Sequence, residues 1–297
     1  MSTPSVYLVD ASIYLFRAWH SMPDEFLNER GQPTNAVYGF TGFLCNLLEQ
    51  ARPSHVGVAF DLSLTTSFRN DIYPEYKANR DPAPEALQRQ FAWARQVAEA
   101  MGLSCYGDAR YEADDLIGTL AAFWRERGHA INVVTGDKDL AQLLGDGDSW
   151  WDFARGTRLG PEGVFERFGV TPSQIPDYLA LTGDPVDNIP GIPGVGPKTA
   201  VALLAHFGDL DALFGRLGEV EHLRFRGART LAPKLEAHRE TAELARRLTG
   251  IDCAVPSALE APEVRRGDVD ETSLNRLFGE LSFGGMLRQR CLGTGSV

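Results

Sequence analysis

Val6-Tyr7-Leu8-Val9-Asp10 is a short apolar run, rich in residues that favour β-structure, and it ends on a carboxylate. Such a run predicts a buried strand. Val56–Phe60 repeats the pattern and leads into Asp61, and Ile131–Val134 leads into Thr135-Gly136-Asp137-Lys138-Asp139. Patterns typical of helices separate the three runs, which predicts βαβ units and a parallel sheet. Because ligands bind at the carboxyl ends of parallel strands, we expect these acids to share one site.

A second acidic cluster, Tyr111-Glu112-Ala113-Asp114-Asp115, begins an apolar helix that we expect to end near Gly128. Three carboxylates within four residues repel one another unless a proton, a cation or solvent relieves them. On an ideal helix Glu112 and Asp115 share a face, whereas Asp114 points about 160° away from Glu112. We therefore rank Asp114 last of the three as a direct ligand of a cation. An acidic first turn stabilised by the helix dipole is the alternative interpretation.

Composition describes an ordinary globular chain of 297 residues, 43% hydrophobic and 23% charged. No apolar run approaches the ~20 residues that span a membrane, and the first residues lack the features of a signal peptide. The four cysteines form no CxxC pair, so the pattern indicates neither a zinc site nor a disulfide framework. We expect a reduced, cytoplasmic protein. The net charge of −11 argues against a nucleic-acid partner only weakly, because a local basic surface matters more than the total.

The segment from Phe68 to Arg80 interleaves cations, among them Arg69, with aromatic residues. Asp81-Pro82 then provides a helix N-cap and a first-turn proline for an amphipathic helix that reaches Met101. A solvated loop before a surface helix is one interpretation. Beside an acidic pocket, however, cations and aromatic rings also suit a phosphate backbone with stacked bases.

Asp184–Gly196 forms a glycine- and proline-rich hairpin between two predicted helices. The first helix follows a capping box at Thr171–Gln174 and ends at Gly183, and the second covers Val201–Phe207. Gly191, Gly194, Gly196, Lys198 and Thr199 lie at or near the start of the second helix. Free backbone N–H groups and the dipole at a helix N-terminus bind phosphate, so we expect this hairpin to hold a nucleic-acid backbone.

The remaining sequence predicts further helices near Arg239–Leu248 and Ser273–Leu281, with Pro256–Asp268 as an extended linker. A basic run precedes them: Arg224, Arg226, Arg229 and Lys234. For most of these cations we expect an ordinary solvated face.

Nine acids stand at candidate metal positions: Asp10, Asp61, Glu112, Asp114, Asp115, Asp137, Asp139, Asp184 and Asp187. No histidine or cysteine accompanies them, and an all-oxygen set favours Mg²⁺ or Mn²⁺ over zinc. Two such ions about 4 Å apart stabilise the attacking and leaving oxygens of a phosphodiester displacement. The pattern predicts metal-assisted hydrolysis of nucleic acid.

With these motifs together, the chain resembles the 5′→3′ exonuclease domain of bacterial DNA polymerase I and the related flap endonucleases. The residues that carry the resemblance are, in chain order, Leu8-Val9-Asp10, Phe60-Asp61, Tyr76-Lys77-Ala78-Asn79-Arg80, Glu112-Ala113-Asp114-Asp115, Thr135-Gly136-Asp137-Lys138-Asp139 and Gly183-Asp184-Pro185-Val186-Asp187-Asn188-Ile189-Pro190-Gly191 through Lys198. The motifs follow the family order and cover nearly the whole chain. The chain as given lacks the proofreading and polymerase regions of polymerase I, so we expect a stand-alone nuclease or an excised domain.

The resemblance implies a role for each site residue. Asp10, Asp61, Glu112, Asp114 and Asp115 would hold the catalytic metal, and Asp137, Asp139, Asp184 and Asp187 the second. Lys77 and Arg80 would contact the scissile phosphate from a helical arch, and Arg17 and Tyr76 would position the 5′ end. The hairpin would grip duplex DNA, with a K⁺ ion in many relatives.

The resemblance also implies an architecture. We expect an α/β nuclease core over residues 1–170, with a mostly parallel sheet of the PIN or resolvase-like kind and an arch over about 64–100. A helical duplex-binding region of the helix-hairpin-helix (H3TH) kind is expected over 171–290, followed by a tail over 291–297.

The expected function is that of a monomeric 5′→3′ exonuclease or flap endonuclease acting on DNA, or on RNA primers in RNA–DNA hybrids. Two alternatives remain open. One is a ribonuclease of the PIN type, and the other is a module that binds branched DNA without cutting it. Nine converging carboxylates favour an enzyme over a pure binder, and the hairpin favours a duplex substrate.

Overall fold

The computed structural model describes residues 4–23, 25–62 and 66–295, and these contain one six-stranded sheet. Its strands are β1 (Ser5–Asp10), β2 (Val56–Ala59), β3 (Ser104–Tyr106), β4 (Ala130–Val134), β5 (Ser149–Asp152) and β6 (Thr157–Leu159). The order across the sheet is β3-β2-β1-β4-β5-β6. The first five strands pair in parallel, and β6 pairs antiparallel with β5. The expected α/β class with a mostly parallel sheet is confirmed.

Strand β1 lies between β2 and β4, with Tyr7 opposite Val56 and Val9 opposite Val134. The strand order reverses direction here, because β2 and β3 follow on one side and β4 and β5 on the other. Such a switch point opens a crevice at the carboxyl ends of the strands. The acids after β1, β2 and β4 therefore meet at this one edge of the sheet.

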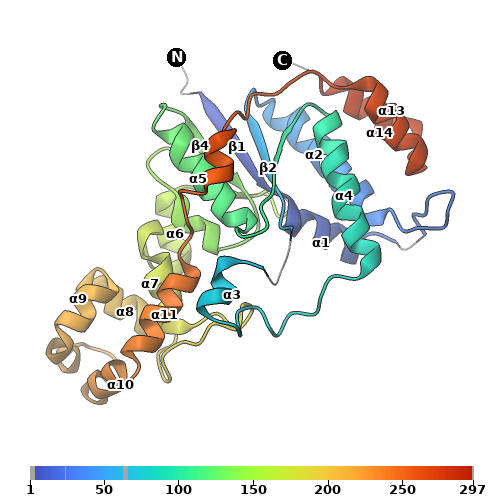
Figure 1. Cartoon of the computed structure of the whole chain (residues 1–297). Helices are drawn as coiled ribbons and strands as arrows, with labels where there is room; N and C mark the ends of the chain where they lie inside the picture. Colours follow the sequence, from blue (N-terminus) through green and yellow to red (C-terminus); the bar gives the residue numbers. More distant parts are fainter. Residues whose placement is uncertain (1–3, 24, 63–65, 296–297) are drawn as a thin grey trace.

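The helices divide between the two faces of the sheet and a separate helical region (Figure 1). The α-helices are α1 (Ala11–Ser21), α2 (Asn35–Ala51), α3 (Phe68–Ile72), α4 (Glu85–Ala100), α5 (Ala113–Arg125), α6 (Pro161–Phe168), α7 (Ile175–Thr182), α8 (Pro197–Phe207), α9 (Leu210–Gly215), α10 (Ala232–Ala237), α11 (Arg239–Thr249), α12 (Pro256–Glu260), α13 (Glu271–Glu280) and α14 (Gly285–Gly293). Short 3₁₀ segments are η1 (Asp139–Leu143), η2 (Pro172–Gln174), η3 (Leu217–His222) and η4 (Ala228–Thr230).

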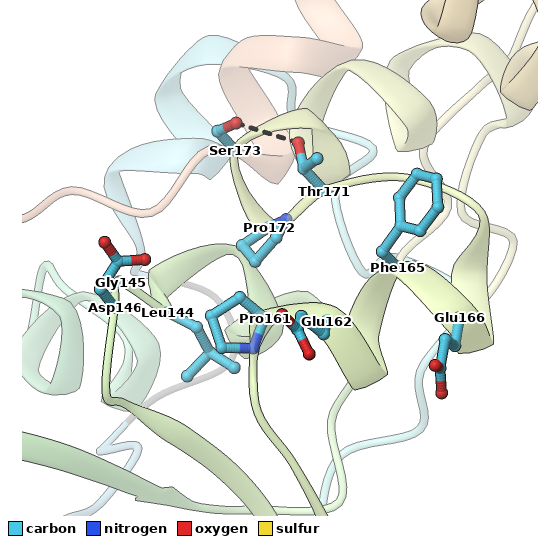
Figure 2. A pocket seen from close by; sticks show the side chains of 10 residues that line it. All are labelled: Leu144, Gly145, Asp146, Pro161, Glu162, Phe165, Glu166, Thr171, Pro172 and Ser173. Carbon is cyan, nitrogen blue, oxygen red and sulfur yellow. Dashed lines mark hydrogen bonds between the residues drawn. The ribbon is translucent and has the colours of Figure 1, made fainter.

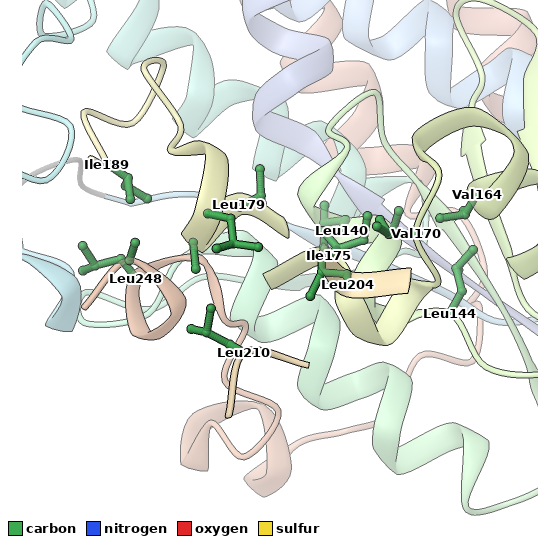
Figure 3. Packing of buried hydrophobic residues seen from close by; sticks show 14 of the residues in the cluster. Leu140, Leu144, Val164, Val170, Ile175, Leu179, Ile189, Leu204, Leu210 and Leu248 are labelled. Carbon is green, nitrogen blue, oxygen red and sulfur yellow. The ribbon is translucent and has the colours of Figure 1, made fainter. Parts of the chain in front are cut away.

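Two apolar clusters hold these layers together. One joins a face of the sheet to α5 and continues without a break into the helical region, through residues such as Leu140, Ile175, Leu204 and Leu248 (Figure 3). The other packs α1, α2 and α4 on the opposite face. Continuous burial between sheet and helical region fixes the position of the hairpin relative to the strand ends.

The C-terminal helices lie where the sequence did not place them. We expected helices up to residue 290 to join the helical region, but α13 and α14 pack against α4 and α2 beside the sheet (Figure 1). The buried face of α13 consists of Leu274, Leu277 and Phe278. Helix α14 also continues through residues that we expected to form a tail.

Two local predictions are wrong. The helix expected from Asp81-Pro82 begins at Glu85, because Pro84 keeps the residue before it out of helical geometry and itself has extended backbone, with ψ of 143°. Pro256–Asp268 is not wholly extended, since Pro256–Glu260 forms α12 with Ala258 buried. The arch expected over about 64–100 begins in residues that the structure does not describe. In the described part it comprises α3, a turn-rich segment and α4.

Candidate active site

Asp10 links β1 to the neighbouring strand end. It is the last residue of β1 and the N-cap of α1, and its Oδ1 accepts a hydrogen bond from the Ile13 N–H at 3.3 Å. Its Oδ2 accepts a hydrogen bond from the Thr135 hydroxyl, just after β4, at 2.9 Å. The side chain is buried. Asp10 is therefore held rigidly in the crevice between β1 and β4.

Asp61 brings the end of β2 to the start of α5. The Asp61 N–H donates to the Ser12 hydroxyl at 3.2 Å, and Asp61 Oδ1 accepts from the Ala113 N–H at 2.8 Å. A carboxylate at a helix N-terminus is stabilised by the free N–H groups and the dipole. The strand-end acids and the acidic helix start thus meet in one place, as the sequence predicted.

The three acids at the start of α5 point in different directions from those expected. Glu112 is the N-cap and has extended backbone, with φ −82° and ψ 165°, so helical spacing does not apply to its side chain. Asp115 is fully buried, and its Oδ2 accepts from the Glu112 N–H at 3.1 Å in a capping box. Burial raises the pKa of Asp114, and repulsion from Asp137 and Asp10 raises it further. The expected ranking is reversed: Asp114 faces the acidic site and Asp115 faces the interior.

Arg69 is the partner of Asp115. Its Nη1 and Nη2 donate to the two Asp115 oxygens at 2.7 and 2.8 Å, and its other donors reach the Leu248 and Gly250 carbonyls at 2.8 Å each. The Arg69 side chain is buried. The prediction that Arg69 contacts nucleic acid is wrong for this structure, because its guanidinium has no free donor facing solvent.

The loop after β4 positions two further acids. The Asp137 N–H donates to the Thr135 hydroxyl at 3.0 Å, and the Asp139 N–H donates to Asp137 Oδ1 at 2.9 Å. Asp139 Oδ1 is buried and, within the described chain, has no hydrogen-bond partner. The nearest cationic group to it is Lys138 Nζ, at 3.8 Å. A buried carboxylate oxygen without a partner is costly, and a cation would relieve it.

Asp184 and Asp187 come from the loop before the hairpin and are paired with cations. Lys138 Nζ donates to Asp184 Oδ2 at 2.8 Å. Arg80 donates to Asp187 Oδ1, and the Lys77 N–H donates to the Asp187 carbonyl at 3.0 Å. This loop therefore joins the acidic site to the segment that precedes α4.

Tyr76 and Lys77 contact the site from that segment. The Tyr76 hydroxyl donates to Glu112 Oε2 at 3.1 Å, and Lys77 Nζ donates to the same oxygen at 2.7 Å. Burial opposes the charge on Lys77, but Glu112 and Asp187 outweigh it and hold its pKa well above the usual value. The Lys77 backbone has φ +56°, a strained conformation for a residue with a side chain. Lys77 thus stays charged and is held over the acids.

Arg17 does not join this group. It lies exposed on α1 and makes no hydrogen bond or ion pair to the site acids among the residues that the structure describes. Sequence reasoning also missed three contributors: Ser12, Thr135 and Lys138. Lys138 could have been found from its position between Asp137 and Asp139, because a cation there neutralises two neighbouring acids.

Mutual repulsion among the carboxylates marks this site. Burial first, and then Asp61 and Asp137, raise the pKa of Asp10 to about 7. Burial, Asp137 and the loop acids raise the pKa of Asp139 to about 8, against the opposing Lys138. In the described residues no three acidic, histidine or cysteine side chains form a ready-made metal cage. The set instead suits a hard, oxygen-seeking cation that keeps several waters, as Mg²⁺ does.

The hairpin lies between α7 and α8 as predicted, but α8 begins at Pro197 rather than at Val201, so Lys198 and Thr199 belong to the helix. Gly191 packs so closely on the α7–hairpin junction that a Cβ there would lie 2.3 Å from the Thr182 carbonyl carbon. Gly194 has φ +87°, and Gly196 is the N-cap of α8, which has no side-chain cap and no acid in its first turn. Lys198 lies exposed in that first turn. Pro197 has no N–H and the Thr199 N–H donates to the Gly196 carbonyl at 3.0 Å, so the positive end of the helix dipole and Lys198, with no acid beside them, are what favour an anion here.

A hollow of about 530 Å³ lies elsewhere, beside α6 (Figure 2). Phe165, Leu144 and Pro172 are among its apolar residues, and Glu162 and Glu166 are among its acids. Acids and apolar groups do not suit a phosphate backbone, so this hollow is not part of the nuclease site.

The sequence matches known families over most of its length. Residues 5–169 match the family described as 5′-3′ exonuclease, N-terminal resolvase-like domain, and residues 170–272 match 5′-3′ exonuclease, C-terminal SAM fold. DNA polymerase I of Mycobacterium tuberculosis (strain ATCC 25618 / H37Rv) is 40% identical over 296 residues, covering 98% of this chain and 32% of the relative. DNA polymerase I of Pseudomonas aeruginosa is 41% identical over 284 residues, covering 95% and 31%. The chain spans about a third of the length of these relatives.

Solved structures share the fold. A T5 5′-exonuclease with bound zinc ions has a TM-score of 0.68 at 21% identity, over 93% of this chain and 99% of that one. The catalytic core of Rad2 in complex with a DNA substrate has a TM-score of 0.63 at 15% identity, over 98% and 91%. The resemblance seen in the sequence motifs is confirmed: the chain belongs to the 5′-3′ exonuclease family.

Proposed function

We propose that the chain is a divalent-metal-dependent 5′ nuclease that hydrolyses phosphodiesters at junctions of single- and double-stranded DNA. The observation that carries this proposal is the meeting of Asp10, Asp61, Asp114 and Asp137: Asp61 and Asp137 raise the pKa of Asp10, and Asp137, Asp10 and Asp61 raise the pKa of Asp114. Membership in the 5′-3′ exonuclease family supports it. So do the zinc ions in the T5 5′-exonuclease structure and the DNA in the Rad2 complex.

Two groups of acids would hold the metal ions, which we propose to be Mg²⁺ or Mn²⁺. Asp10, Asp61, Glu112 and Asp114 form the first group. The second consists of Asp137, Asp139, Asp184 and Asp187. Asp115, also expected in the first group, contributes indirectly by fixing Glu112 and Arg69. When bound, the ions supply an activated water and neutralise the charge that develops on the phosphate. The partnerless oxygen of Asp139 supports a cation in the second group.

Lys77 and Arg80 would act on the scissile phosphate. Each now donates to an acid of the site, Lys77 to Glu112 and Arg80 to Asp187. A phosphate and a metal that arrive together allow these pairs to exchange, so that the acids bind metal and the cations bind phosphate. Cations placed where charge develops stabilise the transition state of phosphoryl transfer. Tyr76 keeps Glu112 in position through its hydroxyl. Arg17 would act only on the single strand, away from the acids.

The hairpin would bind the duplex backbone through the free N–H groups near Gly191, Gly194 and Gly196, with Lys198 and Thr199 beside them. A K⁺ ion at the hairpin carbonyls is part of this proposal. The hairpin and the acids are far apart in the sequence, but one shared apolar core holds the hairpin in a fixed position relative to the sheet. One duplex would therefore contact both.

A basic surface next to the hairpin would extend the contact with the duplex backbone. Arg224, Arg226, Arg229 and Lys234 are exposed, and no ion pair within the described residues engages them, in a chain of net charge −11. Lys234 Nζ lies 4.0 Å from the position of a Cβ on Gly194. Arg229 lines a groove of about 690 Å³. Unpaired lysine and arginine side chains that neutralise phosphates release the counterions condensed on DNA, so we propose a backbone contact for this face in place of the ordinary solvated face expected from sequence.

We further propose a monomer with a nuclease core over 1–170 and a duplex-binding region after it, acting in the cytoplasm on DNA flaps and on RNA–DNA hybrids. No helix within the described residues is long and apolar enough to cross a membrane.

The test is cleavage of a 5′-flap DNA with and without Mg²⁺. We expect Asp137→Asn to lower the rate by at least about tenfold, since it removes one charge from the second metal group. Glu162→Gln, an exposed acid beside the α6 hollow, is the matched control and should cleave as the wild type does. Unchanged cleavage by Asp137→Asn would refute the two-metal assignment.

The same assay separates the alternatives. Preferential cleavage of unstructured RNA would favour the PIN-type ribonuclease. Tight flap binding without product at millimolar Mg²⁺ or Mn²⁺ would favour a non-cutting DNA-binding module. Mapped products would show whether cutting is exonucleolytic or endonucleolytic.

A further inference from the structure

Two cysteines that are far apart in the sequence meet inside the molecule. Cys45 Sγ on α2 and Cys291 Sγ on α14 lie 3.3 Å apart, and both side chains are fully buried. Both are free thiols, as are Cys105 and Cys253. No local pattern indicates this pair, because 246 positions separate its members. Neither thiol belongs to the acidic site or to the duplex-binding surface.

An ion pair beside the two thiols fixes the position of α14 relative to α2. Arg290, which precedes Cys291, donates to both oxygens of Glu49 at 3.0 and 2.8 Å and to Asn46 Oδ1 at 2.6 Å. Asn46 follows Cys45 in α2. These contacts hold α14 against α2 at the residues next to the thiols, so the two sulfurs face each other in a fixed arrangement. Joining them requires a shift of about 1 Å, since a disulfide bond is about 2.05 Å long.

From this geometry we propose that Cys45 and Cys291 form an oxidative modification site, at which a peroxide joins α14 to α2 through a disulfide. The first step forms a bond between the Cys45 sulfur and one peroxide oxygen and breaks the O–O bond, with the Cys45 proton leaving in water. Cys291 sulfur then attacks the Cys45 sulfur, the S–O bond breaks, and a second water carries away the Cys291 proton. Two electrons pass from the thiols to the peroxide.

The hydrogen bond from Cys291 lowers the pKa of the Cys45 thiol against the effect of burial, and the Arg290 guanidinium lowers it further. Thiolate character is what determines reactivity towards peroxide. The same hydrogen bond and burial raise the pKa of Cys291, although Arg290 lowers it as well, so we take Cys45 as the first thiol to react and Cys291 as the resolving thiol.

Access comes through local opening of α14. Only Leu287 and Cys291 of this helix are buried, whereas Met286 is 81% exposed. A short helix with so few buried contacts opens more readily than the core. Reduced, α14 is held by packing and by the Arg290 ion pair. Oxidised, it is tied to α2 by a covalent bond, and the closed loop of over two hundred residues restricts the unfolded chain.

The experiment treats the whole chain with a small excess of hydrogen peroxide. We expect the intact mass to fall by two hydrogen atoms, a non-reducing digest to contain a Cys45–Cys291 peptide pair, and Tm to rise by about 5–10 °C until reductant reverses it. Flap cleavage should not change, because neither thiol contacts the site.

Controls keep the result interpretable even if a buried substitution disturbs folding. Cys253→Ala, which removes an exposed thiol, should give the same mass loss and Tm rise as the wild type. Cys45→Ala and Cys291→Ala should each abolish both. Oxygen addition to Cys45 without a disulfide, pairing that involves Cys105 or Cys253, or an unchanged Tm in a correctly paired protein would each overturn the proposal.

Discussion

Replacing Arg69 with alanine tests whether this residue holds the fold together or contacts nucleic acid. Its guanidinium makes two hydrogen bonds to Asp115 and one each to the Leu248 and Gly250 carbonyls. It therefore joins α3, α5 and the end of α11, three elements from distant parts of the sequence. From the sequence pattern alone, in contrast, we expected Arg69 to contact the phosphate backbone of a nucleic acid.

The structure sets the size of the expected loss. Asp115 is 0% exposed and Arg69 2% exposed, so Arg69→Ala leaves a carboxylate buried without its cation. Breaking a buried pair by removing one partner costs about 3–5 kcal/mol. At about 2–4 °C per kcal/mol, Tm should fall by roughly 6–20 °C. DNA affinity should change little at a temperature where the variant is folded.

The assay pairs urea unfolding with flap binding in Ca²⁺, a metal chosen to slow cleavage. Arg110→Ala is the matched control, because its ion pair with Asp71 is exposed, at 58% and 64%. Such a surface pair contributes about 0–1 kcal/mol. If Arg69→Ala lost less than about 1 kcal/mol while its DNA affinity fell sharply, the buried pair would be refuted and the sequence-based role restored.

Three further predictions concern the site and its substrate. Asp114→Asn should lower flap cleavage by about 10–100-fold, and wild-type activity in that variant would return Asp114 to a peripheral role. In EDTA, Tm should rise as pH falls from 8 towards 4: Asp10 and Asp139, with folded pKa values of about 7 and 8 against 3.8 unfolded, bind protons more tightly in the folded state. A Tm that fell over this range would contradict their mutual repulsion. The double variant Arg224→Gln, Arg226→Gln should reduce the slope of log Kd against log salt by about 1 per lost phosphate contact, and an unchanged slope would exclude these arginines from the interface.

The pairing of cations with the site acids has a functional meaning. Lys77, Arg80 and Lys138 each donate to an acid that we assign to metal binding. In the absence of metal these pairs reduce the repulsion that the acids would otherwise suffer. They also keep the loop around Asp187 joined to the segment before α4, so that both parts are in place when DNA arrives.

Local patterns were enough for the strands that matter. Val6–Val9, Val56–Phe60 and Ile131–Val134 are mostly buried and, apart from Asn132, lack polar side chains, so each stands out against its flanks as an apolar run. Strands β3 and β6 were not predicted, because three residues are too few to show a period. Their pairing comes from the neighbouring strands.

The sequence alone determined the class of fold, the edge of the sheet where the acids gather, and the hairpin, because these depend on apolar runs, strand ends and glycines that are local in the chain. Only the tertiary structure decided which acids face that edge. Asp114 and Asp115 are neighbours with the same side chain, and the extended backbone of Glu112 together with the buried Arg69 turns one outward and the other inward. The meeting of Cys45 with Cys291 is likewise tertiary. Such choices depend on partners from distant segments, which no local pattern records.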